Sequence, residues 1–504
     1  MPGSCDPLAV EGENAEAYSR SSVASTRSSE GGQGRPPVAR LCRHRPLGNP
    51  QPLQYTARGG IRMADTNSRQ PLPELPARFS LPLIGDTLAF VRDPAGFLQG
   101  RARELGPVFR IDVFGAPTAC FVGPEAFALV LDDKNVARAG ANPPHVEELF
   151  NPEAVPFLDG EKQRRRKRLL MRAFTPDALE EYLPTIEQVI DRYANRWAGL
   201  GRFKWVPELN AMGFAIAGSL FTGADAQADD PRIEAAFDRF AAGILSLPLR
   251  LPFTPFTRAL RARAFLLGLI DRAIGEHERS PRKDVLSRLL NAREGSDKLG
   301  RDEVRIETFH FFGAYAAVIG GLSFLAQCLG RYPEIRARAR EEIRRQAPSG
   351  PLDMAAIRRL EYLDRVCKES RRVAPVLPIT FFGKVMRECS FDGVRIPEGH
   401  KAVGCIGSTL LDGGIYHDPG RFDPDRWLSA TDRQQKAWIP HGGGIHAEGH
   451  RCAGEALATQ MLKVFAVRML RRFDWSVENQ DLSPTKGKLF ATPASGLQVE
   501  LKSS

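Results

Sequence analysis

The sequence lacks the cysteine pairs that mark disulfide frameworks and structural zinc sites. Its 504 residues include eight cysteines, and no two of them are spaced as Cys-x-x-Cys. Scattered single cysteines argue against a disulfide scaffold and a zinc ribbon, and they favour a reducing, cytoplasmic setting. The cysteines are Cys5, Cys42, Cys120, Cys328, Cys367, Cys389, Cys405 and Cys452.

The sequence also lacks an N-terminal apolar run of the kind found in signal peptides and membrane anchors. Its most apolar stretch is internal, at 309–329, and is long enough to cross a bilayer. This stretch contains His310, Ser323 and Gln327 and has no clear basic cluster on one flank. We therefore expect a helix buried in the protein centre, and no transmembrane anchor.

Modules that read nucleic acids are missing as well, although the chain is basic. Its formal net charge of +10 suits either a nucleic-acid binder or an enzyme that docks an acidic partner. The sequence contains no paired Cys/His zinc spacing and no aromatic RNA-binding signature. We therefore expect no nucleic-acid partner.

The composition is that of a globular protein with a large core, since 42% of the residues are hydrophobic and 26% are charged. Residues 1–62 differ: they are rich in Ser, Arg, Gly and Pro and show no apolar periodicity, which predicts disorder. Acidic residues in this segment argue against a transit peptide. A misassigned start, with Met63 as the true first residue, is the simpler explanation. We expect a leader over 1–70 and one domain over 71–504.

The patterning predicts a mainly α fold with a small β part. Helical periodicity runs from Glu161 to about Gln346, and a final helix follows Gly454. Three prolines and two phenylalanines interrupt the helical pattern at 247–256. Short strands are predicted at 109–114, 118–122, 379–385 and 393–396.

The strongest local signal is a glycine-rich segment at 441–455 that contains Cys452. Glycines let the backbone approach a sulfur closely beneath a flat macrocycle, backbone N–H groups tune a thiolate ligand, and a helix that starts after the cysteine points its positive end at the sulfur. Two other readings of the loop stay open: an inert cysteine, or a zinc site formed by His441, His446, His450 and Cys452.

Two motifs precede this loop. Glu369 and Arg372 lie three residues apart on one face of a helix, which by itself suits an ordinary surface ion pair. Phe422-x-Pro424-x-Arg426 follows. In order and approximate spacing, the three motifs resemble the cytochrome P-450 superfamily, over about 72–499. The resemblance implies that family's fold, a triangular helical bundle around haem b, with Cys452 as the ligand of iron.

The resemblance implies roles for further residues. Glu369 and Arg372 would form a buried network with Arg426 behind the haem. The segments at 82–87 and 106–109 are similar to the family's N-terminal part, and the body is most similar to retinoid- and sterol-type members. The residues implied to contact haem are Gln163, Lys167, Lys384, Gly444, His450, Arg451 and Gly454.

The cysteine loop departs from the family's usual pattern, because the spacing from Gly444 to Cys452 is longer. His441 replaces the Phe that shields the sulfur, and His450 stands where an Arg is usual. The loop is instead similar to that of the fatty-acid peroxygenase branch, which uses hydrogen peroxide.

The central helix departs too. In ordinary monooxygenases an acid followed by Thr relays protons there, and the corresponding residues here are Ala316 and Ala317. The segment 309–322 contains no Ser, Thr, Asp, Glu or Arg. Only His310 and Tyr315 can handle a proton, and we expect His310 to be a packed helix residue. The Arg with which peroxygenases bind a substrate carboxylate is also missing.

The resemblance predicts a haem-thiolate oxidoreductase that oxidises a lipophilic fatty-acid, retinoid or terpenoid molecule, served by an acidic ferredoxin- or flavodoxin-type electron donor. Three alternatives stay open: a peroxide-driven peroxygenase, an isomerase-like enzyme, and a haem protein that only binds a ligand. An apolar pocket is expected near Phe157, 247–256, Phe312, Tyr315 and 376–379.

Overall fold

The computed structural model describes residues 72–78, 85–224 and 230–504. The predicted leader at 1–70 lies outside these residues, as does part of the family-like segment at 82–87. The described residues all belong to one unit by their mutual contacts.

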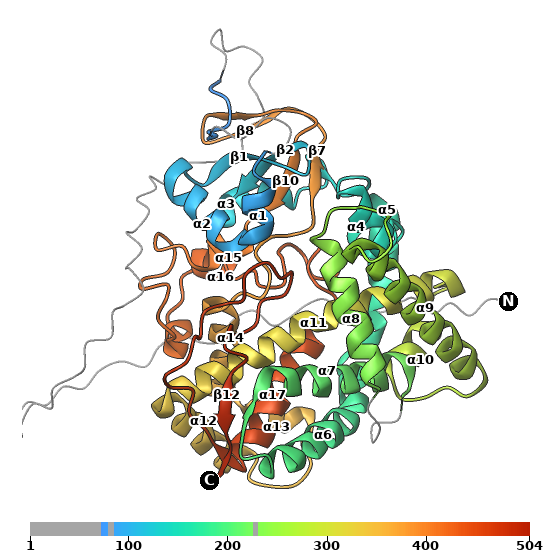
Figure 1. Cartoon of the computed structure of the whole chain (residues 1–504), viewed down its shortest axis with the longest axis vertical. Coiled ribbons are helices and arrows are strands. Elements are labelled where there is room, and N and C mark those ends of the chain that lie inside the picture. The colour runs from blue at the N-terminus through green and yellow to red at the C-terminus, as the bar shows by residue number, and fades with distance from the viewer. Residues whose placement is uncertain (1–71, 79–84, 225–229) are drawn as a thin grey trace, which may run out of the picture. The chain divides into compact units, whose positions relative to one another are not determined.

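Helices make up most of the described structure (Figure 1), as the periodicity predicts. The α-helices are α1 (Thr87–Arg92), α2 (Pro94–Leu105), α3 (Pro124–Val130), α4 (Pro144–Phe150), α5 (Gly160–Met171), α6 (Pro176–Ala198), α7 (Trp205–Thr222), α8 (Pro231–Ile244), α9 (Pro255–Arg279), α10 (Val285–Leu290), α11 (Arg301–Arg331), α12 (Pro333–Gln346), α13 (Met354–Arg359), α14 (Glu361–Val373), α15 (Ile406–Leu410), α16 (Asp432–Lys436) and α17 (Glu455–Leu470). The short 3-10 helices are η1 (Val155–Phe157), η2 (Arg172–Phe174) and η3 (Pro424–Leu428).

Prolines and capping side chains set many of the helix starts. Helices α2, α6, α8, α9 and α12 each begin with Pro, which suits the first turn because its missing N–H has no helical partner there. Before α8 and α9, the side chains of Asp230 and Thr254 accept hydrogen bonds from first-turn N–H groups. Most of the break predicted at 247–256 lies between α8 and α9, and its last two residues begin α9.

The β part contains one five-stranded sheet and several short pairs. The sheet has the order β1-β2-β10-β7-β3, in which β2 and β10 are parallel and the other neighbours antiparallel. The strands are β1 (Val108–Val113), β2 (Ala116–Phe121), β3 (Val136–Ala137), β4 (Arg202–Lys204), β5 (Arg293–Glu294), β6 (Asp297–Lys298), β7 (Gly383–Val385), β8 (Cys389–Phe391), β9 (Val394–Ile396), β10 (Lys401–Gly404), β11 (Phe473–Asp474), β12 (Gln498–Glu500) and β13 (Lys502–Ser503).

The predicted strands correspond to β1, β2, β7 and β9, although β7 is shorter than the predicted 379–385. Strand β10 gives no signal in the sequence because it is short and ends in Gly404. It forms through pairing with β2 on one side and β7 on the other, which joins segments that are far apart in the chain. The sheet lies at one end of the helices, together with α1, α2 and α3 (Figure 1).

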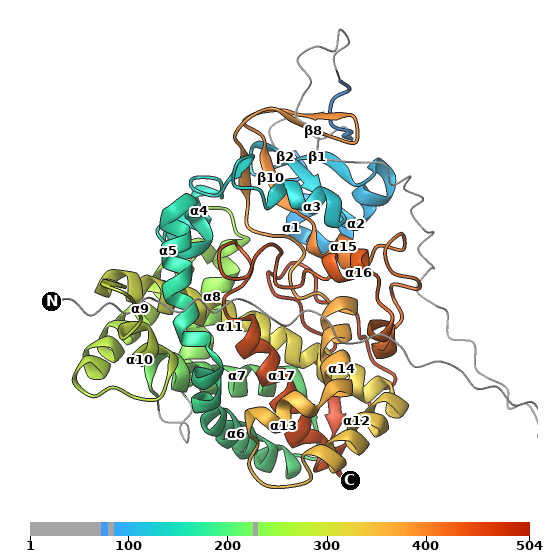
Figure 2. The ribbon, with the colours of Figure 1, turned by 180° about the vertical axis from the view of Figure 1, so that it is seen from behind.

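Helix α11 runs through the middle of the helical part, where it packs against α7, α9, α14 and α17 (Figure 2). It contains the apolar stretch at 309–329, and 72% of its most apolar window is buried inside the protein. Among the described residues it is the only helix long and apolar enough to suit a membrane. Its burial agrees with the predicted core helix.

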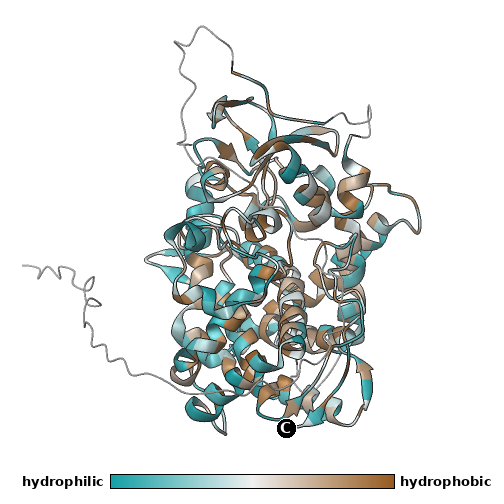
Figure 3. Ribbon diagram, turned by 90° about the vertical axis from the view of Figure 1, so that its left-hand side faces the viewer, coloured by the Kyte–Doolittle hydropathy of each residue, from teal (hydrophilic) through white to brown (hydrophobic). Residues whose placement is uncertain are grey.

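The main hydrophobic core surrounds α11 and α17, where side chains such as Leu325, Leu329, Val464 and Phe465 are fully buried. The helices at the rim carry teal, hydrophilic stretches, and brown stretches lie toward the middle (Figure 3). Burial of apolar surface is the main free-energy gain in folding. It fixes α11 beside the start of α17, and the candidate site lies between these two helices.

Candidate active site

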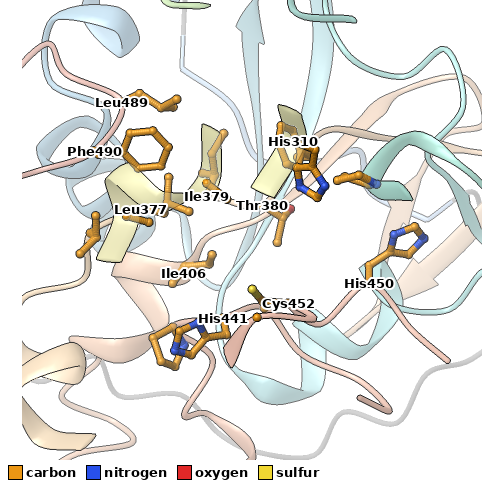
Figure 4. A pocket seen from close by; sticks show the side chains of 18 of the residues that line it. His310, Leu377, Ile379, Thr380, Ile406, His441, His450, Cys452, Leu489 and Phe490 are labelled. Carbon is orange, nitrogen blue, oxygen red and sulfur yellow. The ribbon is translucent and has the colours of Figure 1, made fainter. Parts of the chain in front are cut away.

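A cavity of about 360 Å³ lies between α11 and the segment that carries Cys452. Its walls are mostly apolar, and its size and character suit a small lipophilic ligand. Val155, Pro156 and residues 376–379 line it, as expected from the sequence, but Phe312 and the segment 247–256 do not. In Figure 4, Cys452 reaches into the cavity from below, and Ile406, Leu377 and Ile379 stand along one side.

The loop before Cys452 is shaped by glycines. Gly442 and Gly444 have φ angles of 76° and 89°, in the left-handed region that favours glycine. The Cys452 N–H donates to the carbonyl oxygen of His441 at 3.0 Å, which closes the loop. Gly454 then caps α17, so the positive end of that helix lies beside the sulfur.

The Cys452 thiol is exposed toward the cavity. Surrounding protein atoms nevertheless desolvate it, and this raises the pKa of the thiol. A backbone hydrogen bond from Gly454 and the charges of Lys167 and Arg451 act in the opposite direction. The site therefore supplies partial stabilisation of a thiolate, which a bound cation would complete.

Glu369, Arg372 and Arg426 come together in a network behind the cysteine loop. Both Glu369 and Arg372 are fully buried, and two Arg372 nitrogens donate to the Glu369 carboxylate at 2.8 and 2.9 Å. Arg426 donates to the same carboxylate at 2.8 Å, and the Trp427 indole at 3.0 Å. Arg372 also donates to backbone carbonyls of Leu410, Pro419 and Arg421. The network thus ties α14 to the chain that leads into the cysteine loop.

Gln163 and Lys167 lie one turn apart on α5 and line the cavity. Both donate to the carbonyl oxygen of Gly449, at 3.2 and 3.3 Å, and Lys167 also donates to that of Arg451. The Gln163 Oε1 atom is buried and has no partner among the described residues. Burial lowers the pKa of Lys167 to about 8.

His450 and Arg451 also line the cavity, but in different ways. The Arg451 guanidinium forms two hydrogen bonds with Glu455, at 2.6 and 2.8 Å. The His450 Nε2 atom is buried and has no hydrogen-bond partner among the described residues. Burial, together with the charges of Arg138 and Lys167, lowers the pKa of His450 to about 3. His450 is therefore neutral and has an unused ring nitrogen.

Arg138 is a site residue that sequence reasoning missed. It is buried, lines the cavity and donates to the carbonyl oxygens of Val130 and Phe381 at 2.8 and 3.1 Å. Burial lowers its pKa to about 10. A single Arg after a two-residue strand carries no recognisable pattern, so only the fold reveals it.

Lys384 requires a correction, because it does not lie at the cavity. In β7, Gly383 and Val385 are buried and Lys384 between them is exposed. Successive side chains of a strand point to opposite faces, so the register that buries its neighbours turns Lys384 to solvent. Lys384 is therefore not among the described residues that line the cavity, where contact with a cofactor was expected.

Comparison with known proteins identifies the family. A model described as "Cytochrome P450" matches residues 73–501. The chain belongs to the cytochrome P450 family. Cytochrome P450 120 of Synechocystis sp. is 30% identical over 86% of this chain and 97% of its own length. Abscisic acid 8'-hydroxylase 1 of Arabidopsis thaliana is 26% identical over 86% of this chain and 92% of its own length.

A solved structure shows the same fold. The cyanobacterial CYP120A1 with bound retinoic acid matches 86% of this chain and 100% of its own with a TM-score of 0.80 and 30% identity. The chain is thus an enzyme of the cytochrome P450 type, and its family implies a haem cofactor.

The residues of this cytochrome P450 fit haem. Cys452 presents a thiol to the cavity, and Lys167 contacts only backbone carbonyls among the described residues. The free ring nitrogen of His450 lies in the same cavity lining as the Arg138 and Lys167 cations. Buried cations and a free hydrogen-bonding atom suit carboxylate groups, and Cys452, Arg138, Lys167 and His450 are the residues that would hold haem.

The zinc alternative finds no support in this cytochrome P450. Among the residues that the structure describes, no three His, Cys, Asp or Glu side chains gather as metal ligands would. The His446 ring instead hydrogen-bonds the carbonyl oxygen of Cys452 at 2.8 Å. His441 Nε2 accepts a hydrogen bond from Arg371 at 2.9 Å, since a guanidinium can only donate.

Helix α11 forms the wall opposite the thiol. Ala317 lines the cavity, whereas Ala316 does not. Tyr315 donates its hydroxyl hydrogen to the Met461 sulfur at 2.6 Å, and burial raises its pKa. His310, expected only to pack, stands in the cavity wall. The His310 Nδ1 atom lies 3.2 Å from a carboxylate oxygen of Glu307, which comes just before the apolar stretch.

Proposed function

We propose that this cytochrome P450 is a haem-thiolate monooxygenase that binds haem b and hydroxylates a lipophilic molecule. The observation that carries the proposal is the Cys452 thiol, which faces a mostly apolar cavity of about 360 Å³. One relative is named as an abscisic acid hydroxylase, and another has a structure with bound retinoic acid. They support a substrate with a terpenoid or retinoid carbon skeleton ahead of a fatty acid.

Different residues of the chain have different roles in this proposal. Cys452 would hold the iron, and Arg138, Lys167 and His450 would hold the haem carboxylates. Glu369, Arg372 and Arg426 keep the cysteine loop in place. When bound, haem supplies the one-electron and oxygen chemistry that amino acids lack. The apolar wall excludes water from the reacting carbon.

Electrons would come from an acidic ferredoxin- or flavodoxin-type protein in the cytoplasm. The net charge of +10 supports an acidic partner because opposite charges speed association. Six cysteines in the described residues are free thiols, which suits a reducing compartment.

Hydrogen peroxide is a second candidate oxidant, and the scarcity of proton-carrying groups on the α11 wall supports it. Of the α11 residues that line the cavity, only His310 and Tyr315 carry a proton on a heteroatom, and the Tyr315 hydroxyl is directed to Met461. Hydrogen peroxide brings its own protons and electrons, so it needs less help from this wall.

Parallel turnover assays test the proposal. The purified holoenzyme would receive retinoids, terpenoid acids and fatty acids, with either a ferredoxin reductase system or hydrogen peroxide. Hydroxylated product in the reductase arm is the expected result. Product in the peroxide arm alone would favour the second candidate, and tight binding without product in either arm would leave a protein that only binds its ligand.

A further inference from the structure

Two polar side chains of α11, His310 and Tyr315, stand at the cavity, and the Tyr315 hydroxyl is already bonded to Met461. His310 lies at the cavity with 13% of its side chain exposed, and its ring stacks on Phe311 with the ring centroids 5.2 Å apart. Its Nδ1 atom lies 3.2 Å from the Oε2 atom of Glu307. Within the described chain, the other ring nitrogen, Nε2, has no hydrogen-bond partner.

Glu307 is held rigidly, and this fixes the imidazole. Its side chain is fully buried, and its Oε1 atom accepts hydrogen bonds from the Val155 N–H at 2.9 Å and from Arg166 at 2.8 Å. Arg166 is buried as well and also donates to Glu303 at 2.7 Å. Because α5 and η1 brace the carboxylate, His310 has one preferred orientation.

The same contact decides which nitrogen carries hydrogen. Arg166 already donates to the Glu307 carboxylate, which acts as the acceptor, so the Nδ1 atom of His310 donates to it as well. In the neutral ring the remaining nitrogen, Nε2, is then an acceptor with a free lone pair. No Asp or Glu is among the residues that line the cavity, so no other carboxylate competes there for a donor group.

We propose that His310 Nε2 recognises the hydroxyl group of a lipophilic alcohol. A ligand that fills the cavity displaces water from Nε2, and a buried acceptor left without a partner costs about 1–3 kcal/mol. An O–H group satisfies the nitrogen. A carboxylate does not, since it has no hydrogen to donate and would face the negative charge of Glu307 through the ring.

This recognition deepens the proposed function and rests on it for the position of oxidation. His310 lies seven residues before Ala317 on α11, which is about 10 Å along the helix at 1.5 Å per residue. The hydroxyl is therefore bound about two turns of α11 away from Ala317. The carbon that is oxidised lies at a distance from this hydroxyl.

Ligand binding to the holoenzyme tests the proposal without turnover. Retinol, retinyl methyl ether and retinoic acid share one apolar frame, and their dissociation constants follow from absorbance titration of the haem. We expect retinol to bind at least about tenfold tighter than the ether, in keeping with the cost of an unmade hydrogen bond. His310→Phe should remove this difference, and His310→Gln should keep part of it because its amide oxygen also accepts.

Val318→Ala is the matched control, since Val318 lines the same wall without a polar atom. It should weaken retinol and the ether equally. Equal binding of both ligands to the wild type, or an unchanged preference in His310→Phe, would overturn the proposal. Tightest binding of retinoic acid, lost in His310→Phe, would overturn it too, because it requires a cationic ring.

Failure of the proposed function would be visible separately. Protein that takes up no haem, or that gives no thiolate-type spectrum with carbon monoxide, contradicts the haem-thiolate assignment. The retinol and ether comparison can then be made by quenching of tryptophan fluorescence, and the same preference is expected. Haem uptake and turnover without any preference for the alcohol would contradict only the role of His310.

Discussion

The two sides of the cavity are built in opposite ways. The thiol side comprises the cysteine loop at 441–454 and the Glu369 network, where a buried carboxylate accepts from Arg372, Arg426 and Trp427. The helix wall comprises the cavity-facing residues of α11, which include Ala314, Ala317 and Gly321. One side is rich in hydrogen bonds, and the other offers mainly small and apolar groups.

The difference separates two tasks. Buried polar networks fix a geometry because each unpaired member would cost free energy, which suits a ligand atom that must hold iron. A wall of small residues leaves volume for a substrate and sets its shape by exclusion. Substitutions should therefore affect cofactor binding and stability on the thiol side, and substrate and oxidant use on the helix wall.

The largest expected effect is on the thiol side, from Cys452→Ser. Removing the sulfur takes away the ligand, so the reduced protein with carbon monoxide should lose the red-shifted Soret band of thiolate ligation completely. Cys328→Ala, which removes a buried cysteine of α11, should keep the band. A normal band in Cys452→Ser would contradict the assigned ligand.

Glu369→Gln should give the next largest effect, on stability. It leaves the fully buried Arg372 without its carboxylate, and breaking a buried pair costs about 3–5 kcal/mol. Urea denaturation of the holoenzyme measures the change in the free energy of unfolding. Glu341→Gln, which breaks an exposed pair with Arg344, should change nothing measurable. Equal results for the two variants would refute the structural role of the network.

Ala317→Thr tests the helix wall. The new hydroxyl faces the cavity, where it can pass a proton, and the ratio of product to electrons consumed should rise several-fold with a reductase system. Peroxide-driven product should change little. Ala316→Thr is the control, because Ala316 does not line the cavity. The same gain in both variants would show that cavity position is irrelevant.

The smallest effects should come from two neighbouring glycines of α11. A Cβ atom on Gly320 would lie 2.7 Å from the carbonyl oxygen of Ala491, so Gly320→Ala should lower stability by about 1–3 kcal/mol. A Cβ on Gly321 would meet nothing closer than 3.6 Å, so Gly321→Ala should raise stability by up to about 1 kcal/mol through helix propensity. Thermal unfolding measures both, and a reversed order would contradict the packing of this wall.

The thiol side was more predictable than the helix wall for a physical reason. Glu369, Arg372, Arg426 and Cys452 belong to three ordered motifs that resemble a known family, so their order and spacing were informative together although each motif alone left other interpretations open. Arg138 belongs to no motif, and its approach to the cavity depends on β3 pairing with β7. Lys384 was expected at the cofactor, but the face of the sheet to which its side chain points is known only once the register of β7 is known.

The role of His310 in the helix wall could not be predicted from the sequence either. Its position in an apolar run indicated a packed core residue, since Glu307 lies outside that run. The contact between them depends on Arg166 of α5 and Val155 of η1, which hold the Glu307 carboxylate.

By itself, the sequence determined the mainly α fold, the family likeness and the cysteine that faces the cavity, because periodicity and spaced motifs are local properties of a chain. The tertiary structure alone decided that Arg138 lies at the cavity and Lys384 does not, which face of α11 lines the cavity and how His310 is oriented. These depend on strand register and helix packing, which join residues distant in sequence and therefore leave no local pattern to read.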